Sequence, residues 1–331
     1  MLIYKPEYYD RFRCIASACP DCCCKEWDIQ VDEETARRYR SLTGDLGDRL
    51  RRALTDTEGE TCLTMTEGRC PFWQSDGLCQ VQLALGEKAL CRVCREYPRL
   101  THDYGGFREL GLELSCPEAA RILFSTPPAP MVCVTAPGGE NGDYDREAMA
   151  VLQATRENVR AILETKDRPV REALTLAFLY GCQAQSELDG GESFAFDPEA
   201  ALAEARELAT PGDLEAFFAF FRNLEILTPQ WRELLSHPVS GKWEPGHLTF
   251  ARYLVDRYWL QAVSDYDLYS RVKLMVVACL LVKHLPGPLV KTAQLFSKEI
   301  ENDAENVDAL LDAAYTGAAF RDGCLLGLLA E

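Results

Sequence analysis

The chain has 331 residues, of which 47% are hydrophobic and 10% aromatic, enough apolar mass for one large globular domain or two ordinary ones. Its 35 Lys and Arg side chains are outnumbered by 52 Asp and Glu, and the net charge of −17 opposes bulk nucleic-acid binding. The most apolar run, residues 272–282, is too short to cross a membrane and is expected to be a buried helix.

Cysteine usage divides the chain. Twelve of its fifteen cysteines precede residue 134, and the remaining three, Cys182, Cys279 and Cys324, are expected in a core. The opening MLIYKPEYYD is not an apolar signal segment, so we expect reduced thiols and a cytoplasmic protein. Proline and glycine are frequent in residues 125–145, which predicts a connector. The predicted parts are a cysteine-rich metal module (1–124), the connector (125–145) and an all-helical domain (146–331).

Two helices are predicted within the module. One begins after Asp32, where an N-cap acid precedes an acidic first turn, and the other covers residues 81–95. Beyond the connector, apolar residues recur at helical spacing in six segments: 148–163, 173–182, 214–227, 250–263, 269–285 and 306–314. The expected fold is therefore mainly α: a cysteine-rich metal-binding N-terminal module of short helices and loops, packed on an all-helical C-terminal array.

Ten cysteines occur in four fragments: FRCIASACPDCCCKEWDI, CPFWQSDGLC, CRVCREYPR and LSCPEAAR. Close spacing lets thiolates converge from turns, so the fragments predict a metal site whose binding energy also supports folding. Buried free thiols and disulfides are the alternatives, but a reducing compartment opposes the latter.

The cysteine spacing does not decide which metal is bound. Zinc favours paired CxxC knuckles, and the only isolated pair is Cys91 with Cys94. Cys14, Cys19 and Cys22 match the opening of a plant-type iron–sulfur pattern, without a clear fourth ligand. The C-x3-C-x2-C triplet of radical enzymes does not occur, and no glycine-rich turn indicates the doubly wound methyltransferase fold.

These fragments resemble the flagellin lysine-N-methylase family, which is itself similar to putative zinc- or iron-chelating proteins with eight cysteines. The resemblance includes FRCIASAC, CCKEWDI, CPFWQSDGLC, LGEKALCRVCREYPR and LSCPEAAR, and continues downstream in RYLVDRYWLQAVSDYDLYSRVKLMVVACLLVKHL and SKEIENDAENVDALL. It implies methyl transfer from S-adenosylmethionine to lysines of a protein acceptor, flagellin, with a 4Fe-4S cluster. Eight thiolates exceed the four that one cubane needs, so the others could bind a second cluster, bind zinc or be structural.

The resemblance also implies which thiols are metal ligands. The family-like set is Cys14, Cys19, Cys23, Cys24, Cys70, Cys79, Cys94 and Cys116. Cys22 and Cys91 depart from the pattern, as does Glu26, which stands where glycine is expected before Trp27. These departures leave the eight-thiol frame intact.

Methyl transfer requires a neutral amine, whereas a free lysine, with a pKa of about 10.4, is charged at neutral pH. Residues beside the cysteine fragments or on a late helix that could contribute to the site are Tyr97, Arg99, Glu118, Glu299 and Glu301. Trp27 is expected to pack against the metal loop, and His102 is the one histidine near the thiols in sequence. The catalytic base and the residues that bind S-adenosylmethionine stay unassigned.

Two other functions remain open. The chain could be a nonenzymatic zinc- or iron-binding protein whose acidic helices recognise a partner, or it could methylate another protein or peptide. Binding of S-adenosylmethionine separates the first alternative from a methylase.

Overall fold

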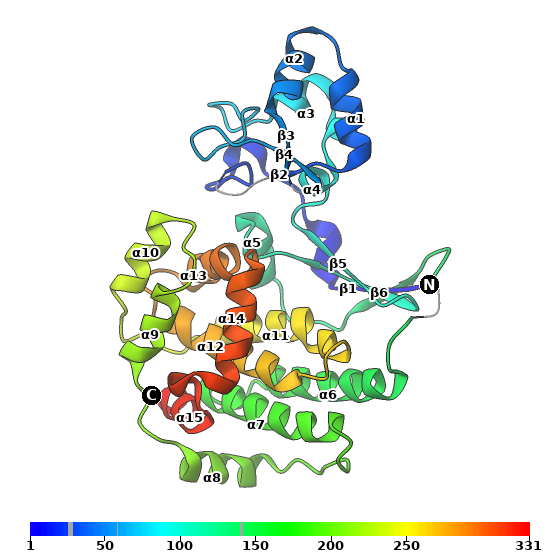
Figure 1. Ribbon diagram of the computed structural model, residues 1–331. Coiled ribbons are helices and arrows are strands. Elements are labelled where there is room, and N and C mark those ends of the chain that lie inside the picture. Colours follow the sequence, from blue (N-terminus) through cyan, green and yellow to red (C-terminus); the bar gives the residue numbers. More distant parts are fainter. Residues whose placement is uncertain (26–28, 58, 140–141) are drawn as a thin grey trace.

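The computed structural model describes residues 1–25, 29–57, 59–139 and 142–331. Two parts are visible in Figure 1: a small module, residues 29–96, and a larger helical body below it. The N-terminal loop and residues 97–98 connect the two parts. Among the described residues, no helix is long and apolar enough to span a membrane.

In its described residues, the small module contains four short α-helices, one 3-10 helix and a three-stranded antiparallel sheet of order β2-β4-β3. Its elements are β2 (Ile29–Gln30), α1 (Glu33–Ser41), α2 (Gly44–Ala53), β3 (Leu54–Thr57), β4 (Glu60–Leu63), α3 (Gln80–Leu85), η3 (Glu87–Ala89) and α4 (Arg92–Glu96). Tyr39, Leu50 and Phe72 are buried in its own hydrophobic core. That core is separate from the main one, so the module has its own packing.

Asp32 begins α1 as predicted. Its carboxylate accepts a hydrogen bond from the Thr35 N–H at 3.0 Å and another from the Arg92 N–H at 2.8 Å, where α4 starts. One side chain therefore caps α1 and holds the first turn of α4. The single helix predicted over residues 81–95 is wrong: Gly86, at φ 82°, ends α3, and η3 with a short extended link separates it from α4.

A four-stranded sheet of order β5-β6-β1-β7 lies on the body side. Its strands are β1 (Leu2–Lys5), β5 (Arg99–Asp103), β6 (Phe107–Leu112) and β7 (Val132–Thr135). Strand β1 runs parallel to β6 and antiparallel to β7, so the first strand of the chain occupies the interior of the sheet. The backbone between β1 and the module carries two short helical turns, η1 (Glu7–Arg11) and η2 (Ala16–Ala18).

The helical body confirms the mainly α prediction for residues 146–331, all of which are described and none of which lies in a strand. With α5 (Pro117–Ser125), its elements are α6 (Arg146–Glu164), α7 (Val170–Leu188), α8 (Pro198–Leu208), α9 (Leu214–Arg222), α10 (Pro229–Ser236), α11 (Gly246–Tyr258), η4 (Trp259–Val263), α12 (Leu268–His284), α13 (Leu289–Phe296), η5 (Ser297–Glu301), α14 (Ala304–Thr316), η6 (Ala318–Phe320) and α15 (Asp322–Ala330). Helix α12 is buried along its whole length and forms the centre of the main core, as expected from its apolar sequence.

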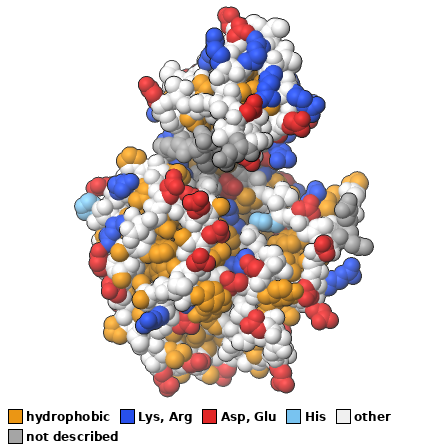
Figure 2. Space-filling model, viewed as in Figure 1, with side chains coloured by type: hydrophobic (Ala, Val, Ile, Leu, Met, Phe, Trp, Pro, Cys, Tyr) orange, Lys and Arg blue, Asp and Glu red, His pale blue; other side chains and the backbone are white. Residues whose placement is uncertain are grey.

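The two parts differ in surface charge. Acidic side chains are spread over the visible face of the helical body, whereas several basic side chains gather on the small module (Figure 2). On this face the small module therefore presents a higher proportion of cations than the helical body does.

A thiol-lined cavity between the small module and the helical body

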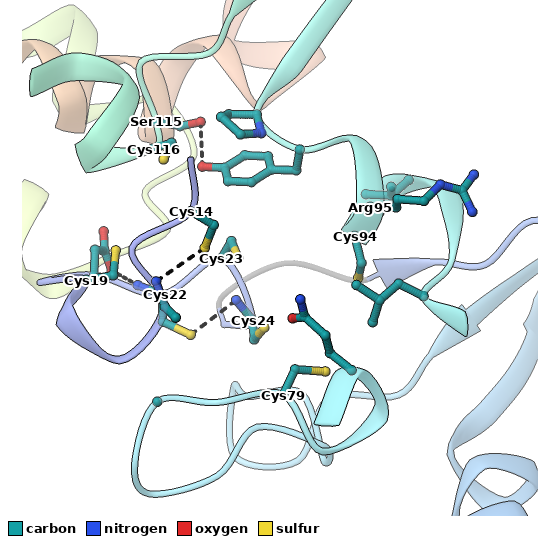
Figure 3. A pocket seen from close by; sticks show the side chains of 18 of the residues that line it. Cys14, Cys19, Cys22, Cys23, Cys24, Cys79, Cys94, Arg95, Ser115 and Cys116 are labelled. Atoms are coloured by element: carbon teal, nitrogen blue, oxygen red, sulfur yellow. Dashed lines mark hydrogen bonds between the residues drawn. The ribbon is translucent and has the colours of Figure 1, made fainter. Parts of the chain in front are cut away.

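A cavity of about 340 Å³ opens where the small module meets the body. Eight cysteines line it: Cys14, Cys19, Cys22, Cys23, Cys24, Cys79, Cys94 and Cys116. They surround a common space, supplied by the N-terminal loop, the start of α3, the helix α4 and the start of α5 (Figure 3). We call this space the thiol cavity.

Seven of the eight thiols in the predicted set line the thiol cavity. The eighth, Cys70, is buried in the small module, and its N–H donates to the Cys24 carbonyl at 2.7 Å. Of the two departures from the pattern, Cys22 lines the cavity, whereas Cys91 is buried in the module core at the start of α4. The structure thus brings seven of the predicted thiols to one cavity, although they are spread over 103 residues of sequence.

Backbone amides in the N-terminal loop point at two of the sulfurs. The Ala16 N–H donates to Cys14 Sγ at 3.4 Å, and the Cys24 N–H donates to Cys22 Sγ at 3.3 Å. At Cys22 this hydrogen bond favours the thiolate over the thiol. The local turns therefore prepare part of the loop for a negatively charged sulfur.

The thiols near the cavity differ in their pKa values. Hydrogen bonds from the Cys24 thiol and the Cys24 N–H, together with the charge of Lys25, lower the pKa of Cys22 to about 6 against the effect of burial. Burial raises the pKa of Cys70 to about 11 and that of Cys116 to about 12. Buried thiols of this kind lose their protons when they bind a metal ion.

Among the residues that the structure describes, cations outnumber acids in the cavity wall. Its charged side chains other than thiols are Arg13, Lys25, Arg95, Arg99, Lys298, Asp21 and Glu87. A carboxylate oxygen of Asp21 lies 2.9 Å from Lys25 Nζ and another 3.2 Å from Lys298 Nζ. Burial raises the pKa of Asp21, but the two lysines and the Cys22 N–H outweigh it and lower this pKa to about 2. The wall therefore suits anionic groups, including thiolates and carboxylates, in a chain whose net charge is −17.

The described side chains do not close around a metal ion. Within the described ranges, no group of three or more His, Cys, Asp and Glu residues is placed so that it could hold a metal ion. The chemistry of the donor set nevertheless fits a thiophilic metal, because soft thiolates select zinc, copper(I) and iron–sulfur clusters. What the structure shows is a gathering of thiols and cations around one space.

The candidate residues other than cysteine lie partly in the cavity wall and partly outside it. Tyr97 lines the thiol cavity with its hydroxyl 3.0 Å from Ser115 Oγ, and Arg99 lines it with the guanidinium stacked over the Phe12 ring. Glu118 is buried outside the cavity wall and pairs with Arg121. Tyr97 and Arg99 therefore remain candidates at the cavity, whereas Glu118 has a structural contact.

Glu299 and Glu301 are fixed within the body rather than at the cavity. Glu299 accepts from the Leu227 N–H at 2.8 Å and from the Thr228 hydroxyl, and Glu301 accepts from Tyr253. His102 lines a separate surface hollow with residues 143–145, Gln261 and Tyr266, away from the thiols. Glu26 and Trp27 lie outside the described residues.

Sequence reasoning missed the basic wall of the cavity. Lys298 comes from η5, and its Nζ also lies 3.3 Å from the other Asp21 carboxylate oxygen. Gln294, one turn earlier in α13, donates to the Ser115 carbonyl at 2.8 Å. The two residues are far from the cysteines in sequence, so no local spacing could have revealed them.

This fold and cavity define a class of protein in which a small thiol-bearing module is seated on a helical body, with its cysteines facing the junction. Comparison with known proteins places the chain more narrowly. It is 34% identical over 135 residues to the flagellar biosynthetic protein FliU of Salmonella muenchen, and the match covers 38% of this chain and 79% of that protein.

Two lysine-N-methylases give similar matches. The one from Salmonella typhimurium is 35% identical and the one from Salmonella choleraesuis 34%, each over 135 residues. In both cases the match spans 38% of this chain but only 33% of the relative. No family model matches the sequence, and no solved structure is significantly similar. The chain belongs to the flagellin lysine-N-methylase family.

Proposed function

We propose that the protein transfers methyl groups from S-adenosylmethionine to lysine side chains of a protein acceptor, flagellin, and that its cysteines hold a 4Fe-4S cluster. The observation that carries the proposal is the match to lysine-N-methylases and to a flagellar biosynthetic protein. The thiol cavity supports it, because it gathers metal-type ligands beside a space of small-molecule size.

The cavity wall suits the methyl donor. S-adenosylmethionine carries a carboxylate on its methionine portion, and Arg13, Arg95 and Arg99 border the space from three different segments. Guanidinium groups bind carboxylates through paired hydrogen bonds, which fixes orientation as well as position. One of these arginines would hold the carboxylate and aim the sulfonium methyl group into the cavity.

The same cations would assist the acceptor. A lysine side chain entering the cavity meets Lys25, Lys298 and the arginines, whose charges disfavour its ammonium form and lower its pKa. Tyr97 presents a polar hydroxyl at the wall, supported by Ser115, that can hydrogen-bond the incoming amine. Desolvation and charge thus favour the neutral amine that methyl transfer needs.

The residues that would hold the cluster come from the eight-thiol set: Cys14, Cys19, Cys23, Cys24, Cys70, Cys79, Cys94 and Cys116. When bound, an iron–sulfur cluster supplies iron that can exchange electrons or coordinate a ligand. The chain's own contribution is a wall of cations that offsets thiolate charge and amides that point at sulfur.

The decisive experiment incubates anaerobically purified protein with S-adenosylmethionine and flagellin, followed by mass spectrometry of flagellin lysines. We expect mass increments of single methyl groups on lysine side chains, and weaker donor binding in an Arg99→Ala variant than in the surface control Arg108→Ala. Cluster-replete protein that binds the donor yet leaves flagellin unmodified would remove flagellin as acceptor and favour another protein or peptide.

A nonenzymatic metal-binding protein is the second candidate. It is favoured by the thiols themselves, because ten cysteines in four fragments need no methyl donor to explain them. Zinc is the alternative metal, since four thiolates satisfy its tetrahedral shell. Titration calorimetry with S-adenosylmethionine decides: no binding by the metal-loaded protein would make this the better description.

A further inference from the structure

We propose that Glu113 and Ser115 are positioning residues, which fix the Tyr97 hydroxyl so that its oxygen accepts an N–H from the acceptor amine. Held in this way, Tyr97 aligns the amine and leaves the nitrogen lone pair for the methyl group. The inference rests on the lysine methylation in the proposed function and extends it to the residues that orient the nucleophile. It does not depend on which metal the thiols bind.

Three side chains carry the two hydrogen bonds. The hydroxyl oxygens of Tyr97 and Ser115 lie 3.0 Å apart, and Ser115 Oγ lies 3.4 Å from Glu113 Oε2. Figure 3 marks the first of these contacts at Ser115. Tyr97 and Ser115 both line the thiol cavity, and Glu113 lies outside its lining. The second contact is long, as hydrogen bonds of an active site without its substrate often are. We call these three residues the Tyr-Ser-Glu triad.

The backbone brings the members of the triad together. Strands β5 and β6 pair up to their ends, and just beyond them the Glu113 N–H donates to the Pro98 carbonyl at 2.7 Å. Ser115 is held from the helical body, because its carbonyl accepts a hydrogen bond from the Gln294 side chain at 2.8 Å. The segments that carry Tyr97 and Glu113 are therefore placed side by side by one strand pair.

The direction of the hydrogen bonds follows from the number of protons. A carboxylate can only accept, and a serine hydroxyl has one proton to donate. When Ser115 donates to Glu113, it can only accept from Tyr97, so the Tyr97 proton points toward Ser115. The Tyr97 oxygen then presents lone pairs, and no proton, to a group in the cavity.

A largely buried arginine supports Glu113 as an acceptor. Burial is the largest influence on the Glu113 carboxyl and raises its pKa, whereas the charge of Arg257 lowers it. The Arg257 side chain is 10% exposed, lies 3.3 Å from Glu301 and donates to the Tyr253 hydroxyl at 3.0 Å. Because a guanidinium stays charged in proteins, this fixed cation favours the carboxylate form of Glu113.

Methyl transfer needs this direction. The amine nitrogen attacks with its lone pair: a nitrogen–carbon bond forms, and the carbon–sulfur bond of the sulfonium breaks with its electrons staying on sulfur. The methylated ammonium then releases a proton to water. A Tyr97 hydroxyl that donated to the amine would occupy the lone pair. A hydroxyl that accepts an N–H holds the nitrogen while the lone pair faces the methyl carbon, which is the alignment that fast transfer requires.

Single variants of the full-length, anaerobically purified protein test the triad with S-adenosylmethionine and flagellin. Tyr97→Phe, Ser115→Ala and Glu113→Gln should each lower kcat by about 10-fold and change the KM for flagellin little, because each loses the aligned contact. Glu118→Gln, an acid outside the cavity wall that pairs with Arg121, is the matched control. Circular dichroism identifies a variant that failed to fold. Ser115→Ala and Glu113→Gln break the triad at different points, so either one suffices.

Combined variants separate this role from a purely structural one. If Glu113 and Ser115 act through Tyr97, adding Glu113→Gln or Ser115→Ala to Tyr97→Phe should cause no further loss of kcat. The same loss with and without the Tyr97 hydroxyl would overturn the inference, as would an unchanged kcat in folded Glu113→Gln. Either result would leave the proposed function standing.

Failure of the proposed function has a different signature. An unaltered protein that methylates no acceptor would refute that function. The direction of the hydrogen bonds is then read from carbon-13 NMR of the Tyr97 ring carbon that bears the hydroxyl, with Tyr97→Phe to assign its signal. We expect the signal to shift in Ser115→Ala and in Glu113→Gln. A signal that stays unchanged in both variants would overturn the triad.

Discussion

Lys298 Nζ lies 3.2 Å from Asp21 Oδ2, and this contact joins the π-helical turn η5 to the cysteine loop across 277 residues of sequence. Both side chains are largely buried, with 7% and 10% of their surface exposed. Gln294 adds a second link to the same junction by donating to the Ser115 carbonyl. The loop that carries the first cysteines is therefore held by the far end of the chain.

Replacing Lys298 by Met should loosen this loop. The change leaves the Asp21 carboxylate with less compensation, which should cost about 2–4 kcal/mol of unfolding free energy. Denaturant unfolding gives the free energy, and the alkylation rate of Cys14 reports on the loop. Lys298→Arg keeps the charge and should restore most of both. If Lys298→Met and Lys298→Arg behave alike, the ion pair does not hold the loop.

Replacing either of the two thiols outside the eight-thiol frame, Cys22 and Cys91, should affect metal content less than replacing a thiol within it. Cys91→Ala should retain metal but lose about 1–2 kcal/mol of stability, because Cys91 is 1% exposed and fills the module core. Cys22→Ala, at a half-buried position, should affect both little, whereas Cys116→Ala should reduce metal content. Iron, zinc and sulfide analyses with thermal unfolding measure these effects, and equal metal loss in all three variants would contradict the frame.

A buried ion pair joins the sheet to the body. Arg156 of α6 donates two hydrogen bonds to Glu109 of β6, at 2.6 and 2.8 Å, and both side chains are 6% exposed. Arg156→Leu should leave the buried Glu109 carboxylate without its partner and lower the free energy of unfolding by about 3–5 kcal/mol. Replacing Glu109 by Leu as well should restore much of this stability. Breaking the exposed pair of Arg108 and Asp103 should cause no measurable change in denaturant unfolding.

Acid should destabilise the fold through two buried histidines, His247 and His284, and the half-buried His102. Burial lowers the pKa of His102, His247 and His284, so the folded state favours their neutral forms. Their contribution is complete above the unfolded-state value of about 6.5 and falls as pH drops below it, by up to about 1 kcal/mol per pH unit for each histidine.

Unfolding of a His247→Gln variant across this pH range provides the check. The comparison with the unaltered chain cancels proton uptake by the thiols, and His237→Gln, at an exposed position, is the control. We expect a shallower loss of stability in acid for His247→Gln. Identical slopes for this variant and the unaltered chain would exclude a contribution from His247.

Sequence periodicity sufficed for much of the helical body. Each of the six predicted segments contains a helix, and aspartates such as Asp145, Asp213 and Asp303 cap their first turns as the local rules expect. The helices α8, α10, α13 and α15 were not predicted. They are short, from 8 to 11 residues, and their burial comes from neighbours distant in sequence.

The four-stranded sheet could not have been predicted from local patterns. Strand β1 pairs with β6 and β7, more than 100 residues later, and β7 lies within the segment expected to be a connector. The four residues of β7 are all exposed, so they show no alternation of buried and exposed side chains. Pairing over such separations depends on tertiary context rather than on the sequence of either strand.

The candidate site was predicted in part. Family resemblance selected eight thiols, and the structure places seven of them in one cavity wall with the eighth buried nearby. The cations Arg13, Arg95 and Lys298 were not anticipated, because an isolated basic residue is usually solvated and carries no spacing signal. Their role emerges only when the two ends of the chain are brought together.

The interior position of β1 sets an order of events during synthesis. A ribosome releases β1 and the cysteine loop first, yet β6 and β7, the partners of β1, follow only after residues 107 and 132. Throughout that interval the loop thiols lack Lys298 and the helical body that later surrounds them. The nascent chain therefore passes through a stage in which the thiols of this loop are open to oxidants and to metal ions in the surrounding solution.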